Sequence, residues 1–294
     1  MKRVGVIGIP GGWSSELLAD TVAKKTGERW LIGMEEVCAD LARGRVLYKG
    51  EDLTGFDALI VKKITPVYSP DALDRLELLR YVAERGAPVF SNPTSILRVL
   101  DRLACTVTLR LGDVPMPPTV VTEDVEQAEA AVDAFGAAVF KPLFSTKARG
   151  MRIIEAGRYA REEIEAFRAE GNPVMYIQRR IALPGQDLGI VFLGGEYLAT
   201  YARVQKKGEW NTTTNSGGRY RSVEPRPELI ELAHKAQSLF DLDFTCVDVV
   251  ESDEGPIVFE VSAFGGFRGL VEATGVDPAE RYADYVLTKI GARP

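Results

Sequence analysis

The first 93 residues alternate short apolar runs with longer segments of helical periodicity. Four apolar runs have the length of strands, at 4–9, 30–32, 58–61 and 88–90. Two segments with a helical spacing of apolar positions lie between them, one starting at Ser14 and one from Pro70 to Glu84. Strands that alternate with helices build a parallel sheet covered by helices. We therefore predict an N-terminal α/β domain over residues 1–93.

The next part of the chain, residues 94–177, follows a turn. Asn92-Pro93-Thr94 combines turn residues with a helix N-cap signal, which predicts a helix through Leu111. Beyond it the apolar pattern predicts strands at 119–121, 138–142, 151–155 and 174–179, and helices at 125–135 and 159–169. These elements predict a compact α+β unit over residues 119–177, which we call the lid.

The last part, residues 178–294, begins with a strand meander and ends with a strand pair. Its expected elements are strands at 188–192 and 197–204, a polar loop at 205–219, a helix at 228–240, and strands at 244–250 and 257–261. The turn residues at 252–255 lie between the last two strands, which predicts a hairpin.

Composition places the chain among folded proteins of a reducing compartment. It has 294 residues, 46% apolar and 27% charged, and its three cysteines form no CxxC pair. Pro10 breaks the N-terminal apolar run early, and no stretch of about 18 uncharged apolar residues occurs. We expect a cytoplasmic protein that is neither exported nor embedded in a membrane.

Charge distribution points to an anionic ligand. The net charge of -6 argues against a nucleic-acid partner, yet residues 137–182 hold nine Lys or Arg against five Glu. A positive lobe within an acidic chain suits a small anion. The oligomeric state stays open, and a homo-oligomer is compatible with these features.

The chain has a single histidine, His234, in a segment with the pattern of a surface helix. Ser-His-Asp catalysis and sites with several histidine ligands are therefore nearly excluded. Any metal chemistry must rest on carboxylates.

Asp248 and Glu260 are the carboxylates best placed for such chemistry. Each lies in an apolar strand of the predicted hairpin, where an unpaired carboxylate is costly to bury. Carboxylates that reach from adjacent strands into a cleft suit Mg²⁺, and the glycines of the following segment, 262–269, let a backbone approach phosphate. A solvent-facing carboxylate or a structural ion pair is the alternative interpretation.

Lys141 ends an apolar strand and precedes the segment 144–150, which contains hydroxyls, two cations and a glycine. Two strands joined by such a loop can fold over a polyphosphate. An ordinary lysine at a strand end is the alternative.

The order of these features resembles the ATP-grasp carboxylate–amine ligases, and among them the branch of the RimK-type glutamate ligases. The matching segments are the helix and proline turn at 92–119, the strand and phosphate loop at 138–150, the hinge strand at 175–178, the meander at 194–196 and 201–203, Asn215-Ser-Gly-Gly218, and the pair Asp248 and Glu260. The resemblance covers essentially the whole length. The amino-acid sequences of segments 139–151, 210–218 and 259–267 also resemble those of a subfamily called the GAK-system ATP-grasp enzyme.

This resemblance implies an ATP-grasp fold that combines α/β and α+β parts. A Rossmann-like pre-ATP-grasp domain would occupy residues 1–93, and a linker helix with the lid subdomain residues 94–177. A C-terminal mixed-sheet domain with the metal site would occupy residues 178–294.

Carried over residue by residue, the resemblance also implies site roles. The nucleotide would be bound by Lys141 and Lys147 at its phosphates, by the backbone around Gln178 and Arg179 at adenine, and by Asp187, which faces the nucleotide or the acceptor. The metal, Mg²⁺ or alternatively Mn²⁺, would be held by Asp248, Glu260 and Ser262. Arg203 would be catalytic, steadying an acyl phosphate and a tetrahedral intermediate.

The sequence departs from the family pattern at several positions. Ser262 replaces the usual asparagine ligand, Gly189 an arginine that often meets substrate, Gln178 or Arg179 a hinge glutamate, and Thr146 and Ala148 glycines of the phosphate loop. Together these changes suggest a divergent substrate site.

The implied function is a ligase that phosphorylates an unidentified carboxylate with ATP and joins it to an unidentified amine. Two alternatives remain open at this level. One is an ATP-grasp kinase that stops after phosphorylating a small molecule, and the other is an ATP-binding partner protein without turnover.

Overall fold

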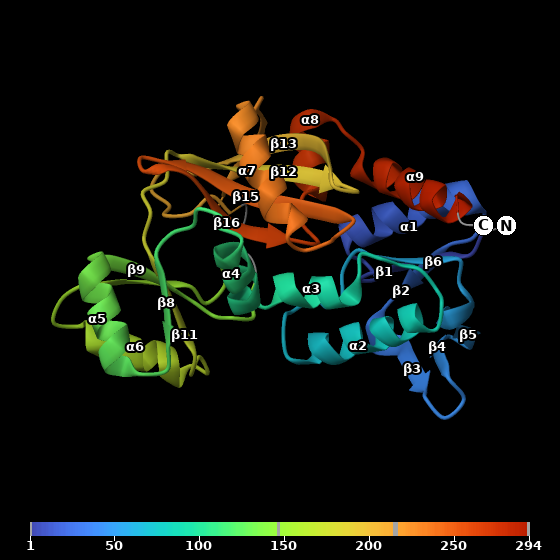
Figure 1. The fold of residues 1–294 in the computed structure, drawn as a ribbon, viewed down its shortest axis with the longest axis horizontal. Coiled ribbons are helices and arrows are strands. Elements are labelled where there is room, and N and C mark those ends of the chain that lie inside the picture. Colours follow the sequence, from blue (N-terminus) through green and yellow to red (C-terminus); the bar gives the residue numbers. More distant parts are fainter. Residues whose placement is uncertain (1, 146–147, 214–216, 293–294) are drawn as a thin grey trace.

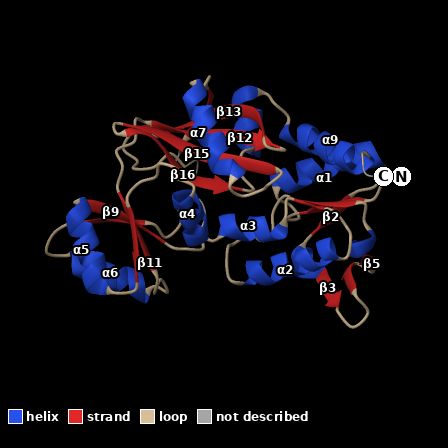
Figure 2. Ribbon diagram, viewed as in Figure 1, coloured by secondary structure: helices blue, strands red, loops and turns tan. Residues whose placement is uncertain are grey.

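The computed structural model describes residues 2–145, 148–213 and 217–292 of the chain (Figure 1). Figure 2 shows helices and strands mixed throughout, with both termini close together at one end of the molecule. Among the described residues, no helix is long and apolar enough to cross a membrane.

The N-terminal part contains a parallel four-stranded sheet. Its strands are β1 (Val4–Ile7), β2 (Trp30–Ile32), β6 (Ala58–Val61) and β7 (Val89–Phe90), in the order β2-β1-β6-β7. The helices α1 (Trp13–Thr26) and α2 (Asp71–Glu84) connect them. The strand and helix pattern predicted for this part is confirmed, because wholly buried strands such as β1 and β6 give continuous apolar runs.

A small antiparallel sheet in the same part was not predicted. It consists of β3 (Val37–Asp40), β4 (Arg45–Tyr48) and β5 (Glu51–Asp52), flanked by the 3₁₀ turns η1 (Met34–Glu36) and η2 (Leu53–Gly55). These strands have at most four residues and carry charges, so their apolar alternation is too short to be distinguished from a loop.

The single helix expected through Leu111 is instead two helices, α3 (Pro93–Leu100) and α4 (Arg102–Leu111). Asp101 breaks the helix because its backbone is extended, and its carboxylate accepts a hydrogen bond from the Leu103 amide at 2.9 Å. Asp is a favoured N-cap residue, so it starts a new helix at this position.

The lid lies at the end of the molecule opposite the termini (Figure 1). Its antiparallel sheet has the order β10-β9-β11-β8, formed by β8 (Thr119–Thr122), β9 (Ala137–Lys141), β10 (Arg152–Glu155) and β11 (Met175–Arg179). The helices α5 (Val125–Phe135) and α6 (Ala160–Ala169) pack on this sheet around Phe140 and Phe167. The lid therefore has a hydrophobic core of its own.

The C-terminal part is built on a five-stranded antiparallel sheet of order β14-β13-β12-β15-β16. Its strands are β12 (Gln186–Leu193), β13 (Glu196–Val204), β14 (Arg219–Ser222), β15 (Phe244–Ser252) and β16 (Gly255–Ser262). The predicted hairpin is confirmed as β15 and β16, and the predicted helix as α7 (Pro227–Ser238). Two further helices, α8 (Phe267–Thr274) and α9 (Pro278–Gly291), were not predicted.

The N-terminal and C-terminal parts share their hydrophobic cores. One core joins Leu79 of α2 and Ile96 of α3 to Val258 of β16, and a second joins Leu18 of α1 to Val286 of α9. The linker helices thus pack into the cores of the N-terminal and C-terminal parts, which together we call the large body, whereas the hydrophobic core of the lid is formed by its own residues. The lid is the one part of the described chain with a separate core.

Candidate active site

A cavity of about 400 Å³ lies where the lid, the linker helices and the C-terminal sheet meet. Most of the predicted site residues line it: Lys141, Gln178, Arg179, Asp187, Arg203, Asp248, Glu260 and Ser262. Lys147, the remaining one, lies outside the described residues. Predicted residues that lie far apart in the chain therefore converge on one cavity; Lys141 and Glu260, for example, are 119 positions apart.

The two predicted metal carboxylates lie directly opposite each other on paired strands. Asp248 of β15 faces Glu260 of β16, next to a register shift in the hairpin. Their side chains are 15% and 47% exposed. Ser262, two residues further on, accepts a hydrogen bond from the Gly265 amide at 3.2 Å. Three oxygen-bearing side chains thus gather at one end of the hairpin.

Burial raises the pKa of Asp248 to about 7, and the neighbouring Glu260 carboxylate adds to this while Arg203 opposes it. A cation at this hairpin would therefore be favoured, because it would offset the cost of two carboxylates held close together.

Arg203 is held by two carboxylates. Its Nε and Nη2 atoms donate to the two oxygens of Asp187 at 3.0 and 2.5 Å, a bidentate geometry. The same Nη2 atom lies 2.7 Å from Asp248 Oδ2. Although burial alone would lower the pKa of Arg203, the carboxylates hold that pKa well above its ordinary value. The guanidinium is therefore charged and fixed in place beside the hairpin.

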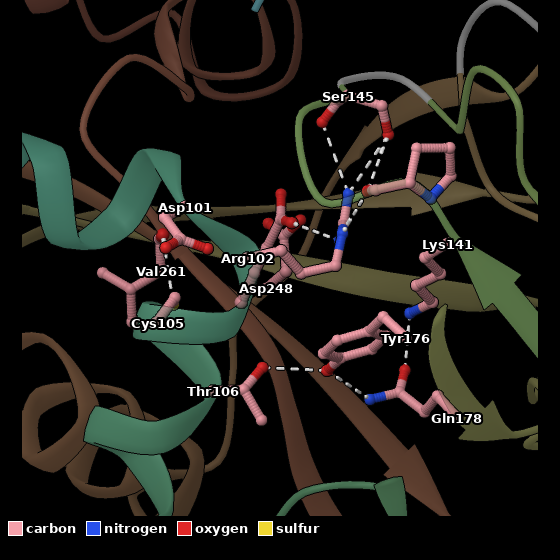
Figure 3. Close-up of polar contacts among 12 residues, drawn as sticks. Asp101, Arg102, Cys105, Thr106, Lys141, Ser145, Tyr176, Gln178, Asp248 and Val261 are labelled. Carbon is pink, nitrogen blue, oxygen red and sulfur yellow. Dashed lines mark hydrogen bonds and ion pairs between the residues drawn. The ribbon is translucent and has the colours of Figure 1, made fainter. Parts of the chain in front are cut away.

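Lys141 faces the cavity from the lid and has a neutral partner. Its Nζ atom donates to Gln178 Oε1, and Gln178 is 2% exposed. The Gln178 amide in turn donates to Tyr176 at 3.2 Å (Figure 3). It also donates to Thr119 at 3.1 Å, so the orientation of the amide is fixed. The lysine is thus aimed by a hydrogen-bonded chain that ends on uncharged groups.

Burial lowers the pKa of Lys141 to about 7, and the nearby Arg102 lowers it further while Glu260 opposes this. The glutamate that the family pattern places at the hinge would have supplied a counter-charge, but Gln178 does not. An anionic ligand in the cavity would supply it instead.

Arg102 is a site residue that the sequence reasoning missed. It lies at the first turn of α4, and its Nε donates to the Pro142 carbonyl at 3.1 Å while Nη2 reaches the Ser145 carbonyl at 3.3 Å (Figure 3). Its Nη1 atom lies 3.7 Å from Glu260 Oε2. Arg102 thus links the start of the phosphate loop to a predicted metal ligand. The sequence did not single out Arg102 because one continuous helix was predicted across Asp101 and Arg102.

The structure also accounts for Gly189, where the family pattern has an arginine. Gly189 of β12 lies opposite Tyr201 of β13, and a Cβ atom at 189 would lie 2.3 Å from the tyrosine ring. A Cβ atom at Gly269 of α8 would lie 2.6 Å from the same ring. Tyr201, hydrogen-bonded to Cys246 at 3.4 Å, therefore fills the space that a side chain at 189 would need.

Comparison with known proteins identifies the family to which this fold and cavity belong. Residues 99–286 match the model of the RimK-like ATP-grasp domain. A probable alpha-L-glutamate ligase of Maridesulfovibrio salexigens is 27% identical over 245 residues, which covers 82% of this chain and 79% of that protein.

Two solved structures are similar over nearly the whole chain. A RimK domain ATP-grasp protein from Sphaerobacter thermophilus is 25% identical, with a TM-score of 0.75 over 97% of this chain and 99% of that one. The ATP-grasp ligase PsnB, solved with a minimal precursor, Mg and ADP, is 19% identical, with a TM-score of 0.72 over 98% of this chain and 97% of that one.

The chain belongs to the RimK-like ATP-grasp family. Its fold is the ATP-grasp fold, as the resemblance implied, and it is an ATP-dependent ligase of the class that forms carbon–nitrogen bonds.

Proposed function

We propose that the chain uses ATP and Mg²⁺ to activate a carboxylate as an acyl phosphate, which an amine then attacks to form an amide. One observation carries the proposal: the cations Lys141 and Arg102 and the carboxylates Asp248 and Glu260 line the same cavity. This combination suits a nucleoside triphosphate with its divalent cation.

The donor set fits Mg²⁺. Asp248 and Glu260 offer carboxylate oxygens from adjacent strands, and Ser262 adds a hydroxyl. Mg²⁺ prefers oxygen ligands and is commonly held by one or two carboxylates together with substrate phosphates. No group of three or more His, Cys, Asp or Glu suited to a metal occurs in the described ranges, so the phosphates would complete the coordination. When bound, the ion supplies neutralisation of phosphate charge.

The protein side chains act mainly by position and charge. Lys141 and Arg102 would neutralise the transferring phosphoryl group, and Arg203, fixed by Asp187 and Asp248, would face the developing oxyanion. Because Arg203 is already oriented by carboxylates, little reorganisation is needed when charge develops.

The bonding changes balance without a protein nucleophile. A carboxylate oxygen of the substrate attacks the γ-phosphorus of ATP, and ADP leaves. The amine nitrogen then attacks the acyl carbon, inorganic phosphate leaves with the carboxylate oxygen, and the nitrogen loses a proton.

L-Glutamate is the first amine to test, since the Maridesulfovibrio relative is named a probable alpha-L-glutamate ligase. A peptide carboxylate is a second substrate class to include, because PsnB was also solved with a precursor peptide. Mn²⁺ can be compared with Mg²⁺ in the same assay. The resemblance to the GAK-system subfamily stays a prediction and adds no substrate.

The proposal is tested by ADP release with ATP, Mg²⁺ and pairs of carboxylates and amines, followed by mass measurement of the product. We expect a product that joins both substrates with loss of water. A product that carries a phosphoryl group and no second substrate would make the chain a kinase. Nucleotide binding without ADP release for any pair would contradict turnover of these substrate classes.

A further inference from the structure

Lys62 is a buried lysine that lies outside the cavity and has no part in the chemistry above. It directly follows β6, at the carboxyl end of that strand, and only 1% of it is exposed. Its Nζ atom donates to the carbonyl oxygen of Phe264 at 2.8 Å and lies 3.9 Å from the centre of the Phe267 ring. This contact joins residues 202 positions apart in the chain.

The environment of Lys62 compensates its charge poorly. Among the residues that the structure describes, no carboxylate forms an ion pair with it. Its ammonium donates to one carbonyl and lies over the rings of Phe267 and Phe244, and Lys63 and Cys246 are also near. Burial accordingly lowers the pKa of Lys62 to about 7. An apolar side chain of similar length would fill the same space at lower cost, because it needs no solvation. Folding alone therefore gives little reason for a lysine here.

The partner of Lys62 belongs to a segment that lines the cavity. Residues 262–267, which we call the glycine loop, connect the hairpin strand β16 to α8, and Ser262 through Gly266 line the cavity. The loop lies tightly against the C-terminal sheet. A Cβ atom at Gly265 would lie 3.2 Å from Cys246 Cβ of β15, and one at Gly266 would lie 3.1 Å from Val191 of β12.

The sheet therefore restricts the glycine loop from one side, and Lys62 holds it through the Phe264 carbonyl. That carbonyl immediately precedes the peptide groups of Gly265 and Gly266, which border the cavity beside Glu260 and Ser262. A small rotation of the Phe264 peptide would move those groups, because glycine backbones resist such rotation least.

We propose that Lys62 is a positioning residue that fixes the glycine loop in its productive geometry. It acts through the Phe264 carbonyl and contacts neither nucleotide nor substrate. Its consequence for turnover rests on the proposed function, whereas its consequence for the order of the loop does not. Nucleotide affinity should depend little on Lys62, since the phosphate contacts in the proposed function come from Lys141 and Arg102.

The first experiment compares Lys62→Met with the wild type by amide hydrogen exchange and thermal unfolding. We expect exchange of residues 263–268 to accelerate about tenfold or more, with β15 and the lid unchanged and the unfolding temperature not lowered. Unchanged exchange in the loop would overturn the proposal. Faster exchange throughout the chain with a lower unfolding temperature would also overturn it, because Lys62 would then be structural only.

The second experiment measures kinetics with the substrate pair found in the ligase assay. We expect kcat of Lys62→Met to fall about tenfold to a hundredfold while the KM for ATP stays within about twofold, since a displaced loop misaligns reacting groups. Lys62→Gln keeps an N–H donor and should lie between Met and wild type. A kcat of Lys62→Met within twofold of wild type would refute the role in turnover.

Leu79→Ala in α2 is the matched control. It removes apolar contacts from the core of the large body at a side chain that does not line the cavity, so it should lower the unfolding temperature without changing loop exchange or kcat. A parallel loss of kcat in Leu79→Ala would assign the effect of Lys62→Met to stability instead. If no substrate pair is found, the exchange experiment still decides the proposal.

Discussion

The two walls of the cavity satisfy their buried charges in different ways. On the wall formed by the C-terminal sheet, the Arg203 guanidinium contacts the carboxylates of both Asp187 and Asp248. On the wall formed by the lid, the Lys141 ammonium donates to the neutral amide of Gln178. The cation of the first wall is thus paired with protein carboxylates, whereas the hydrogen-bond partner of the cation on the second wall is uncharged. An anionic ligand should therefore be stabilised most by the cation of the lid wall.

The difference between the two walls can be tested by removing one cation from each. Arg203→Met leaves Asp187 and Asp248 buried without their partner, so we expect a loss of about 3–5 kcal/mol in the free energy of unfolding. Lys141→Met should not destabilise the protein at pH 7. Denaturant unfolding of both variants measures the contrast, and equal destabilisation would contradict it.

The pKa of Lys141 determines how its charge affects the free energy of unfolding. That pKa is lowered from 10.5 to about 7 in the folded chain. Between these values the unfolded chain binds more protons, so charge on Lys141 costs stability as the pH falls toward 7. Methionine removes this cost.

The acidic hairpin should matter most for chemistry. Glu260→Ala removes a predicted metal ligand, and we expect ATP turnover to fall about 10²–10³-fold, or roughly 3–4 kcal/mol, with the fold intact. A phosphate-release assay checks this. Glu272→Ala removes an exposed glutamate of α8 that pairs with Arg268 and serves as control. Turnover near the wild-type value in Glu260→Ala would refute the metal assignment.

Nucleotide affinity should depend on the lid wall. Lys141→Met removes one charged contact to phosphate, which we expect to weaken ATP binding about 10-fold to 100-fold. Isothermal titration calorimetry with ATP measures the change. An affinity equal to that of the wild type would show that the phosphates lie elsewhere.

The pH dependence of ATP binding also tests the contribution of charged Lys141. Phosphate binds the charged form of Lys141, so affinity should fall as the pH rises from 7 toward 9, by at most about tenfold per pH unit. Measuring without Mg²⁺ keeps Asp248, whose pKa is about 7, from contributing through metal binding. The slope should disappear in Lys141→Met, and an identical slope in both proteins would assign it to the nucleotide.

The smallest expected effect comes from giving the lid wall a counter-charge. Gln178→Glu would place a carboxylate beside Lys141 and raise the pKa of the lysine. We expect ATP affinity at pH 7 to change by only a few-fold, while its decline with pH shifts to higher values. Calorimetry over the same pH range tests this, and an unshifted decline would show that Gln178 does not set the charge of Lys141.

Local patterns predicted most of the elements that frame the cavity. The predicted helix at 125–135 and strand at 58–61 agree with α5 and β6 to the residue, because turn and capping residues border strong apolar periodicity. The hairpin that aligns Asp248 with Glu260 also followed from apolar strands and a polar turn. Asp277-Pro278, a capping residue before a proline, was an unused signal for α9.

The contacts that decide the site could not be predicted because they are non-local. Arg203 lies 45 residues from Asp248, and Lys62 lies 202 residues from Phe264, so no spacing rule links them. Tyr201 fills the space beside Gly189 through a cross-strand pairing whose register depends on the folded sheet. Family resemblance supplied candidate residues, but only the fold gave each of them its partner.

The most direct test of the central claim follows the carboxylate oxygen. With the substrate pair found in the ligase assay, the carboxylate is labelled with ¹⁸O and the released phosphate is analysed by mass spectrometry. Activation as an acyl phosphate predicts one ¹⁸O atom in the inorganic phosphate for each amide formed. Amide formation with unlabelled phosphate would contradict it.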